Sequence, residues 1–264
     1  MSVGGPGREA ASAQVGCWRA SGRRHVLLED SELLEAVPVL ARDGAVAECL
    51  AEIVSLAPGM WPASEHRPQL CEEGLGLLIL DGLVICRRGI DDRFGAELLG
   101  AGDLLRPCQE TEDAPTLPLS TSRRVLAPAR VAVLDPAFAE SIARYPQLGE
   151  QLLARAINRS RNLAVLMAIV HQPRIDTRLH TLFRHLAARW GRMRADGVLV
   201  PLPLTHAVLA DLVAARRPTV TSALAELSRR GLLRTTAQGW HLSREPLCES
   251  CELAGKPLAA TIAA

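Results

Sequence analysis

The stretch at residues 204–234, LTHAVLADLVAARRPTVTSALAELSRRGLLR, predicts two short helices joined by a tight turn. Thr205 is a good N-cap for the first helix, because its hydroxyl can accept a hydrogen bond from a free amide of the first turn. Pro218 suits the first turn of the second helix, where a missing amide hydrogen costs little, and Gly231 can end that helix. Apolar residues recur on one side of each helix: Val208, Leu209, Leu212 and Val213 in the first, and Val220, Leu224 and Leu227 in the second.

Polar side chains gather at the start of the second helix, which is predicted over residues 218–230. Arg216, Arg217, Thr219, Thr221 and Ser222 can donate to phosphates and to base edges in the major groove of DNA. Two short strands, at residues 232–234 and 239–242, follow as a wing. Paired short helices also occur in folds that do not bind DNA, but the polar cluster and the wing together favour a winged helix-turn-helix.

The charge is divided unevenly along the chain, although its net charge is only +1. Residues 150–244 hold 15 arginines and 5 acidic residues, whereas residues 1–149 hold 14 arginines and 21 acidic residues. A basic segment attracts phosphates and makes DNA binding salt-dependent. Residues 150–244 are therefore the expected DNA-binding part of the chain.

Short apolar runs between glycines and acidic turns predict a β-rich domain over residues 25–145. Strands are expected at 75–80, 83–87, 96–99, 123–127 and 130–134, with a helix at 45–53. Asp81-Gly82 is predicted to form the two-residue turn of a hairpin, and Pro128 a second turn. Many short strands with turn signals indicate an antiparallel roll or barrel, so that the whole chain is of the α+β class.

A long helix is predicted over residues 146–172, PQLGEQLLARAINRSRNLAVLMAIVHQ, beginning at Pro146. Apolar residues lie along a seam of this helix at Leu148, Leu152, Ala156, Leu163, Met167 and Val170, with Leu153, Ile157, Leu166 and Ile169 beside it. Such a helix has two apolar faces, one for the β-rich domain and one for a second copy of the chain. The alternative is a single helix buried in a core. Pro173 separates it from a further helix at residues 176–193, in which Leu179, Leu182, Phe183, Leu186 and Trp190 share one side.

The remaining segments are predicted to be a flexible N-terminal segment at residues 1–24 and a flexible tail at 245–264. No run of about 18 apolar residues and no secretory signal occur, which indicates a cytoplasmic protein. The seven cysteines are odd in number and scattered, as expected of reduced thiols. There is no phosphate loop with a lysine, no GxSxG and no HExxH, so the sequence does not predict an enzyme.

In the order of these parts, the chain resembles the Crp/Fnr family of bacterial transcription regulators. The resemblance rests on NLAVLMAIV, RLHTLFRHLAARWG and the helix-turn-helix stretch, and is strongest over residues 150–244. It implies a cyclic-nucleotide-binding-like β-roll at residues 25–145, a dimerisation helix at 146–172 and a winged helix-turn-helix at 173–244. It also implies a homodimer on two-fold symmetric double-stranded DNA, with RNA polymerase and a small-molecule effector as further partners.

By position, the resemblance makes Arg217 and Ser222 readers of bases. It makes Thr205, Arg216 and Thr219 contacts to phosphates. Pro218 stands where many family members have a glutamate that accepts from cytosine, so the half-site is expected to differ from the best-known one.

Members of the family that bind cyclic nucleotides use a glycine-glutamate stretch for the ribose and an arginine followed by serine or threonine for the phosphate. Neither motif is intact in the β-roll at residues 25–145. Glu97, in Gly95-Ala96-Glu97, could take a ribose hydroxyl, but Glu110, Glu112 and Asp113 would repel a phosphate. We therefore expect a regulator that cyclic AMP does not control. The β-roll would be a scaffold or would bind an effector that the sequence does not identify.

Two other interpretations remain open. Cys248 and Cys251 have CxxC spacing, which could form a disulfide or half of a metal site, but one such pair is a weak signal, and no cofactor or metal is predicted. The chain could also be a ligand- or redox-responsive sensor or adaptor that acts through protein partners without specific DNA binding. Steep salt dependence of DNA affinity would separate a DNA reader from an adaptor.

Overall fold

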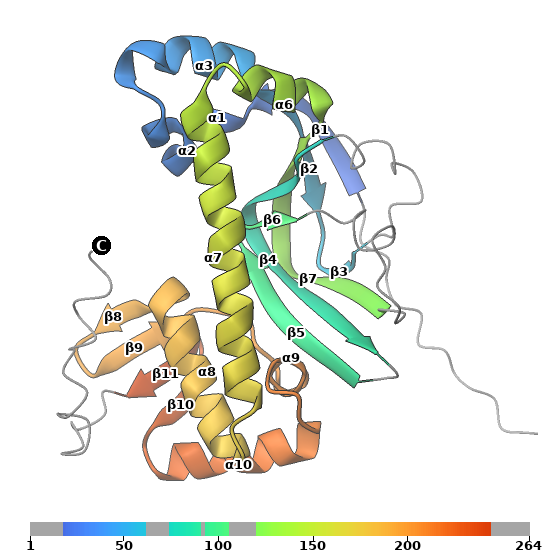
Figure 1. The fold of residues 1–264 in the computed structure, drawn as a ribbon. Coiled ribbons are helices and arrows are strands. Elements are labelled where there is room, and N and C mark those ends of the chain that lie inside the picture. Colours follow the sequence, from blue (N-terminus) through green and yellow to red (C-terminus); the bar gives the residue numbers. More distant parts are fainter. Residues whose placement is uncertain (1–17, 62–73, 91–92, 106–119, 244–264) are drawn as a thin grey trace, which may run out of the picture. The chain divides into compact units, whose positions relative to one another are not determined.

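The computed structural model describes residues 18–61, 74–90, 93–105 and 120–243. The predicted tail at 245–264, with Cys248 and Cys251, and the acidic segment with Glu110, Glu112 and Asp113 lie outside these ranges. The chain divides into two compact units, one formed by residues 1–86 and 98–156 and the other by residues 87–97 and 157–264. Figure 1 shows the elements of both units.

One curved sheet runs through the N-terminal part of the chain, in the strand order β1-β2-β7-β4-β5, with β3 paired to β7 and β6 paired to β4. Its strands are β1 (Trp18–His25), β2 (Leu50–Leu56), β3 (Gly59–Met60), β4 (Gly76–Ile90), β5 (Arg93–Gly100), β6 (Leu104–Leu105) and β7 (Ser120–Leu134). The helices beside it are α1 (Val26–Glu29), α2 (Ser31–Ala36), the 3-10 helix η1 (Val39–Ala41), α3 (Arg42–Glu48) and α6 (Pro136–Ile142). The predicted α+β class with an N-terminal β-roll is thus confirmed.

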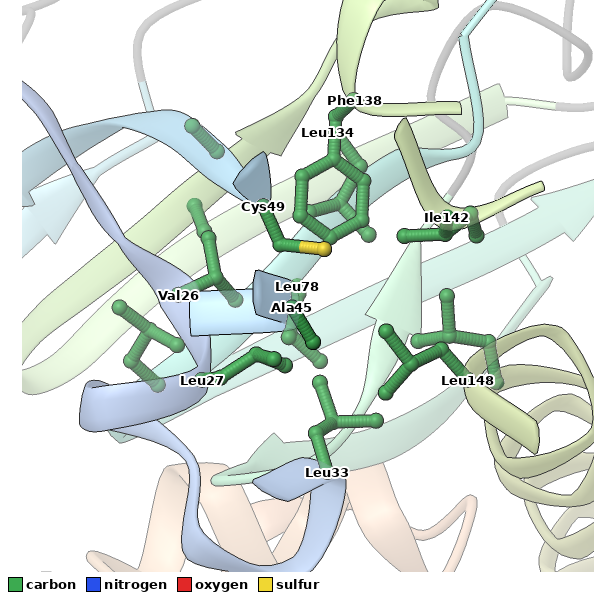
Figure 2. Close-up of a cluster of buried hydrophobic side chains, with 14 of the residues drawn as sticks. Val26, Leu27, Leu33, Ala45, Cys49, Leu78, Leu134, Phe138, Ile142 and Leu148 are labelled. Atoms are coloured by element: carbon green, nitrogen blue, oxygen red, sulfur yellow. The ribbon is translucent and has the colours of Figure 1, made fainter. Parts of the chain in front are cut away.

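The central strands of this sheet are buried on both faces. Alternate residues point to opposite faces of a strand, and in β4 Leu78 belongs to one hydrophobic cluster whereas Leu77 and Ile79 belong to another. Figure 2 shows the first cluster, in which side chains of α1, α2, α3 and α6 meet Leu78 and Leu134 of the sheet. Burial on both faces explains why residues 77–80 and 83–86 of β4 are continuous apolar runs rather than alternating patterns.

The predicted hairpin at Asp81-Gly82 is wrong, because both of its expected strands are parts of β4. Gly82 has φ +94°, but it lies opposite Pro128 and Ala129 of β7, whose backbone a Cβ at residue 82 would meet. The carboxylate of Asp81 accepts from the backbone amide and the Nε of Arg130, at 3.1 and 2.6 Å. The left-handed glycine therefore lets two long strands approach closely instead of turning the chain.

The predicted turn at Pro128 is wrong for the same reason, since β7 continues through it from Ser120 to Leu134. The predicted helix at residues 45–53 is only half correct: α3 ends at Glu48, and the chain from Leu50 pairs with β1 and β7 as strand β2. Residues 18–24, predicted to be flexible, pair with β2 as part of β1. Pairing between distant segments decides all three cases.

The long helix is confirmed as α7 (Pro146–Val170). In its first half, Leu148 and Leu152 are buried in the cluster of Figure 2, and Arg155 forms two hydrogen bonds with Asp30, at 2.6 and 2.8 Å. The next helix, α8 (Ile175–Trp190), buries Leu179, Leu182, Phe183 and Leu186 as predicted. It ends three residues before the predicted end, because Arg192–Arg194 form a strand instead.

The C-terminal elements form a winged helix-turn-helix, as the sequence predicts. They are β8 (Arg192–Arg194), β9 (Gly197–Val200), α9 (His206–Leu212), α10 (Arg217–Arg229), β10 (Leu233–Thr236) and β11 (Gly239–Ser243). The antiparallel sheet has the order β10-β11-β9-β8. The hairpin of β8 and β9 is not predicted from the sequence, because β8 is only three residues long and Arg192, Met193 and Arg194 are all exposed.

Candidate nucleic-acid interface

The first helix of the pair, α9, begins as predicted at Thr205. The Oγ1 of Thr205 accepts a hydrogen bond from the backbone amide of Val208, at 3.3 Å, and the side chain is exposed. A hydroxyl that accepts this bond still has its own hydrogen to donate. Thr205 can therefore cap α9 and donate to a phosphate at the same time.

The turn between the helices contains Ala214 in the left-handed region, with φ +49°. Hydrogen bonds from the amides of Ala214 and Ala215 to the carbonyls of Asp211 and Ala210 close the turn, at 3.3 and 3.0 Å. From α8, the guanidinium of Arg178 donates to the carbonyl of Val213, at 3.1 Å. Left-handed backbone is unfavourable for a residue with a Cβ, so this turn is held by its surroundings.

We expect Ala214→Gly to stabilise the protein, because glycine adopts positive φ without the cost of about 1 to 2 kcal/mol that alanine carries. The greater freedom of glycine in the unfolded chain offsets about 0.4 to 1 kcal/mol of this gain. Thermal unfolding should show a midpoint raised by a few degrees. Ala215→Gly is the matched control and should lower the midpoint, since Ala215 is not in the left-handed region. Equal shifts in both variants would contradict the prediction.

The start of α10 carries an exposed cationic pair. Arg216 is the N-cap residue, its side chain makes no capping hydrogen bond, and Arg217, Pro218 and Thr219 are exposed beside it. Among the residues that the structure describes, neither Arg216 nor Arg217 forms an ion pair. Both guanidinium groups keep their donors for a ligand, and the amino end of a helix favours anions.

The two hydroxyls one turn further along α10 are bonded within the protein. Thr221 Oγ1 donates to the carbonyl of Arg217, at 3.1 Å, and Ser222 Oγ to that of Pro218, at 3.3 Å. Thr221 Oγ1 also lies 3.0 Å from Nδ1 of His206, on α9. The sequence analysis missed this role of His206, because nothing in a linear pattern pairs two residues fifteen positions apart.

The wing is fastened to the rest of this unit by Trp240 and Asp196. The Nε1 of Trp240, on β11, donates to the carbonyl of Leu204, at 3.2 Å, and its ring lies 5.1 Å from that of Phe183. The carboxylate of Asp196 bonds both His241 Nε2, at 2.9 Å, and Arg234, at 2.7 Å. The hydrogen bond to His241 lowers the pKa of the Asp196 carboxyl. These contacts hold β10 and β11 to α8, to the segment before α9 and to the turn between β8 and β9.

Glu97, the residue considered for a ribose, is buried on β5 and already paired. Its carboxylate accepts from Arg88, at 2.6 Å, and from two nitrogens of Arg159, at 2.6 and 3.2 Å. Arg159 belongs to α7. The Glu97 oxygens are thus used by charged donors of the protein itself.

Two cysteines, Cys49 and Cys86, lie in the described ranges, and both are buried. Burial raises the pKa of the Cys49 thiol to about 11, which keeps it protonated and unreactive. Within the described ranges, no three His, Cys, Asp or Glu side chains come together as a metal site would require. No helix there has the length and apolar character needed to span a membrane.

Comparison with known proteins agrees with this geometry. The Crp-like helix-turn-helix domain matches residues 177–248. The chain is 29% identical over 163 residues to a CRP-like cAMP-activated global transcriptional regulator of Mycobacterium tuberculosis. The matched residues make up 60% of this chain and 70% of the relative.

Solved structures share the fold at low sequence identity. A cyclic nucleotide-binding domain containing protein from Listeria monocytogenes has a TM-score of 0.58 and 13% identity, over 80% of this chain and 96% of that one. A CooA mutant from Carboxydothermus hydrogenoformans has a TM-score of 0.55 and 14% identity, over 86% and 94%.

An N-terminal sheet domain, a long helix and a winged helix-turn-helix with exposed arginines define a DNA-binding regulator. The chain carries a Crp-like helix-turn-helix domain and is similar to a CRP-like transcriptional regulator, and these findings support a DNA-binding transcription regulator. Its homologues are transcription regulators and not enzymes, in agreement with the sequence analysis. These findings favour DNA binding over the adaptor role that the sequence left open.

Proposed function

We propose that the chain acts as a homodimer that reads a two-fold symmetric promoter site with α10 and is not controlled by cyclic AMP. The observation that carries this proposal is the exposed pair Arg216 and Arg217 at the amino end of α10, next to a capped α9 and a fastened wing. Recruitment of RNA polymerase and control by a small molecule follow only from the resemblance to the family and stay predictions.

Each polar side chain at the interface has a proposed task. Arg217 donates to the O6 and N7 atoms of a guanine, the most common specific contact in the major groove. Ser222 reads a base as an acceptor, for example from an amino group of cytosine or adenine, because its hydrogen is used inside α10. Arg216, Thr219 and Thr205 bind phosphates, and Pro218 offers no side-chain hydrogen bond to the neighbouring base.

We further propose that α7 (the predicted dimerisation helix of residues 146–172) pairs with its copy in a second chain. Leu153, Ile157 and Met167 are 61%, 45% and 62% exposed, and with Ala164 they follow one side of α7 at near-heptad spacing. This exposed seam differs from the one expected from sequence, since Leu148 and Leu152 are buried in the β domain. Large apolar side chains exposed along one side of α7, interrupted only at Ser160, favour a partner helix over a single buried core helix.

Ile157→Arg is expected to convert the dimer into monomers. Each copy would lose about 1.5 to 3 kcal/mol of apolar burial, so the dimer Kd should rise about a hundredfold or more. Sedimentation velocity over a concentration series measures this. Asn158→Arg places the same charge about 100° around the helix and should leave the Kd nearly unchanged. A monomeric wild-type chain, or equal effects of both variants, would refute the proposed interface.

Independence from cyclic AMP is supported by the pairing of Glu97. For this carboxylate to bind a ribose, it would have to leave Arg88 and Arg159, and two partly buried cations would each lose one ion pair with a buried carboxylate. The acidic segment at residues 110–113, in the region where the resemblance places the phosphate site, lies outside the described ranges. The proposal therefore rests on Glu97 and on the acidic composition of residues 110–113.

The test is fluorescence anisotropy of the full chain with duplex DNA from upstream of its own gene, across a salt series, with and without cyclic AMP. We expect the affinity to fall steeply as salt rises and to be higher for this duplex than for random DNA. Cyclic AMP is expected to leave the binding curves unchanged. Tighter specific binding with cyclic AMP would overturn its exclusion as effector. Absence of any preference over random DNA in both conditions would count against the DNA-reading role.

A further inference from the structure

The hydroxyl of Thr221 lies between two groups that fix its orientation. A carbonyl oxygen can only accept, so the hydrogen of Thr221 Oγ1 points to the carbonyl of Arg217, 3.1 Å away. The bond with His206, at 3.0 Å, must then run from Nδ1–H of the imidazole to Oγ1. The neutral form of His206 carries its hydrogen on Nδ1, and α9 donates to the first turn of α10.

The imidazole of His206 is also held from the wing. Its centroid lies 6.3 Å from that of Trp240, and Trp240 is fixed by its bond to the Leu204 carbonyl and by the ring of Phe183 on α8. The contacts thus run without a break from β11 through Trp240 and His206 to Thr221 and the Arg217 carbonyl. Every residue in this series lies in the winged unit.

We propose that His206 is a positioning residue for base reading, which fixes the first turn of α10 relative to the wing and so sets the path of Arg217 into the groove. This inference rests on the proposed function. Arg217 itself is exposed and makes no ion pair with the described residues, so only its backbone is held in the free protein. A bidentate contact with guanine requires two aligned hydrogen bonds and is sensitive to that backbone position.

The bond also changes the part predicted for Thr221 from the sequence. With its hydrogen given to Arg217 and its oxygen bonded to His206, the hydroxyl is engaged on both sides. Thr221 acts on DNA through the geometry of the helix rather than by direct contact. Replacing either partner of the bond should therefore have the same effect on sequence preference.

The experiment compares two affinities. One is for a two-fold symmetric duplex selected by the wild-type protein, and the other is for the same duplex with one guanine changed in each half-site. The first divided by the second is the specificity ratio. His206→Phe keeps an aromatic ring beside Trp240 but removes the donor, and Thr221→Val removes the acceptor at nearly constant volume. Each is expected to lower the ratio about five- to tenfold. The double variant should fall no further than either single one.

His206→Asn supplies the rescue, because its side-chain amide can donate from nearly the same place as Nδ1, and the ratio should stay within about twofold of wild type. A thermal midpoint measured for every variant separates positioning from stability. The inference is overturned if His206→Phe lowers only the midpoint and leaves the ratio unchanged, or if the two single effects add in the double variant. Absence of sequence preference in the wild-type protein would instead overturn the proposed function, and this inference with it.

Discussion

Arg217→Ala is expected to abolish preference for one base pair in each half-site while leaving general DNA affinity largely intact. A bidentate contact between arginine and guanine contributes about 1 to 3 kcal/mol of discrimination, so two half-sites give roughly 2 to 6 kcal/mol. Arg217 is exposed and free of ion pairs within the described chain, so its removal leaves no buried partner unsatisfied. Anisotropy with the selected duplex and its single-base variants measures the change position by position.

Arg216→Ala is the matched control, since it removes the neighbouring guanidinium from a proposed phosphate site. It should weaken all sequences about equally and lower the salt slope by about one unit for each phosphate that is no longer neutralised. If Arg217→Ala behaved in this same uniform way, Arg217 would bind a phosphate, and the proposed half-site reading would be wrong at that position.

Asp30→Ala is expected to destabilise the first unit by about 4 to 6 kcal/mol. Asp30 and Arg155 form two hydrogen bonds at 2.6 and 2.8 Å, with side chains 9% and 8% exposed. Removing one partner of such a pair costs about 3 to 5 kcal/mol, because the buried guanidinium of Arg155 then keeps only the exposed carboxylate of Glu32 as a partner. Asp30 Oδ1 also caps α2 by accepting from the amide of Leu33, which contributes about 1 kcal/mol more. Urea denaturation monitored by circular dichroism measures the change.

Glu32→Ala gives the comparison within the same cluster. Its carboxylate lies 3.1 Å from Arg155, but its side chain is 72% exposed, so its removal should cost less than about 1 kcal/mol. Asp30→Asn, which keeps a cap but removes the charge, should fall between the two. Similar small effects of Asp30→Ala and Glu32→Ala would show that α7 is held to the β domain by apolar packing alone.

Local pattern was sufficient for the helices of the DNA-binding part. Thr205, Pro218 and Gly231 mark helix ends by the chemistry of their own side chains and backbones, and the spacing of Leu224 and Leu227 shows which side is buried. Each of these signals acts within one or two turns of helix. The segment from Thr205 to Gly231 could therefore be predicted from the sequence alone.

Pairing between distant segments decided the rest. Asp81-Gly82 has the composition of a hairpin turn, but it lies within β4 because Arg130 and the backbone at Pro128 face it from another strand. Likewise, the bond of His206 to Thr221 depends on how α9 packs on α10. The sequence by itself determined the winged helix-turn-helix, its arginines and the basic charge around them, because these depend on neighbours along the chain. Only the tertiary structure decided the path of the long strands, the exposed seam of α7 and the bonds that hold the backbone of Arg217 in place, because these depend on residues that meet only after folding.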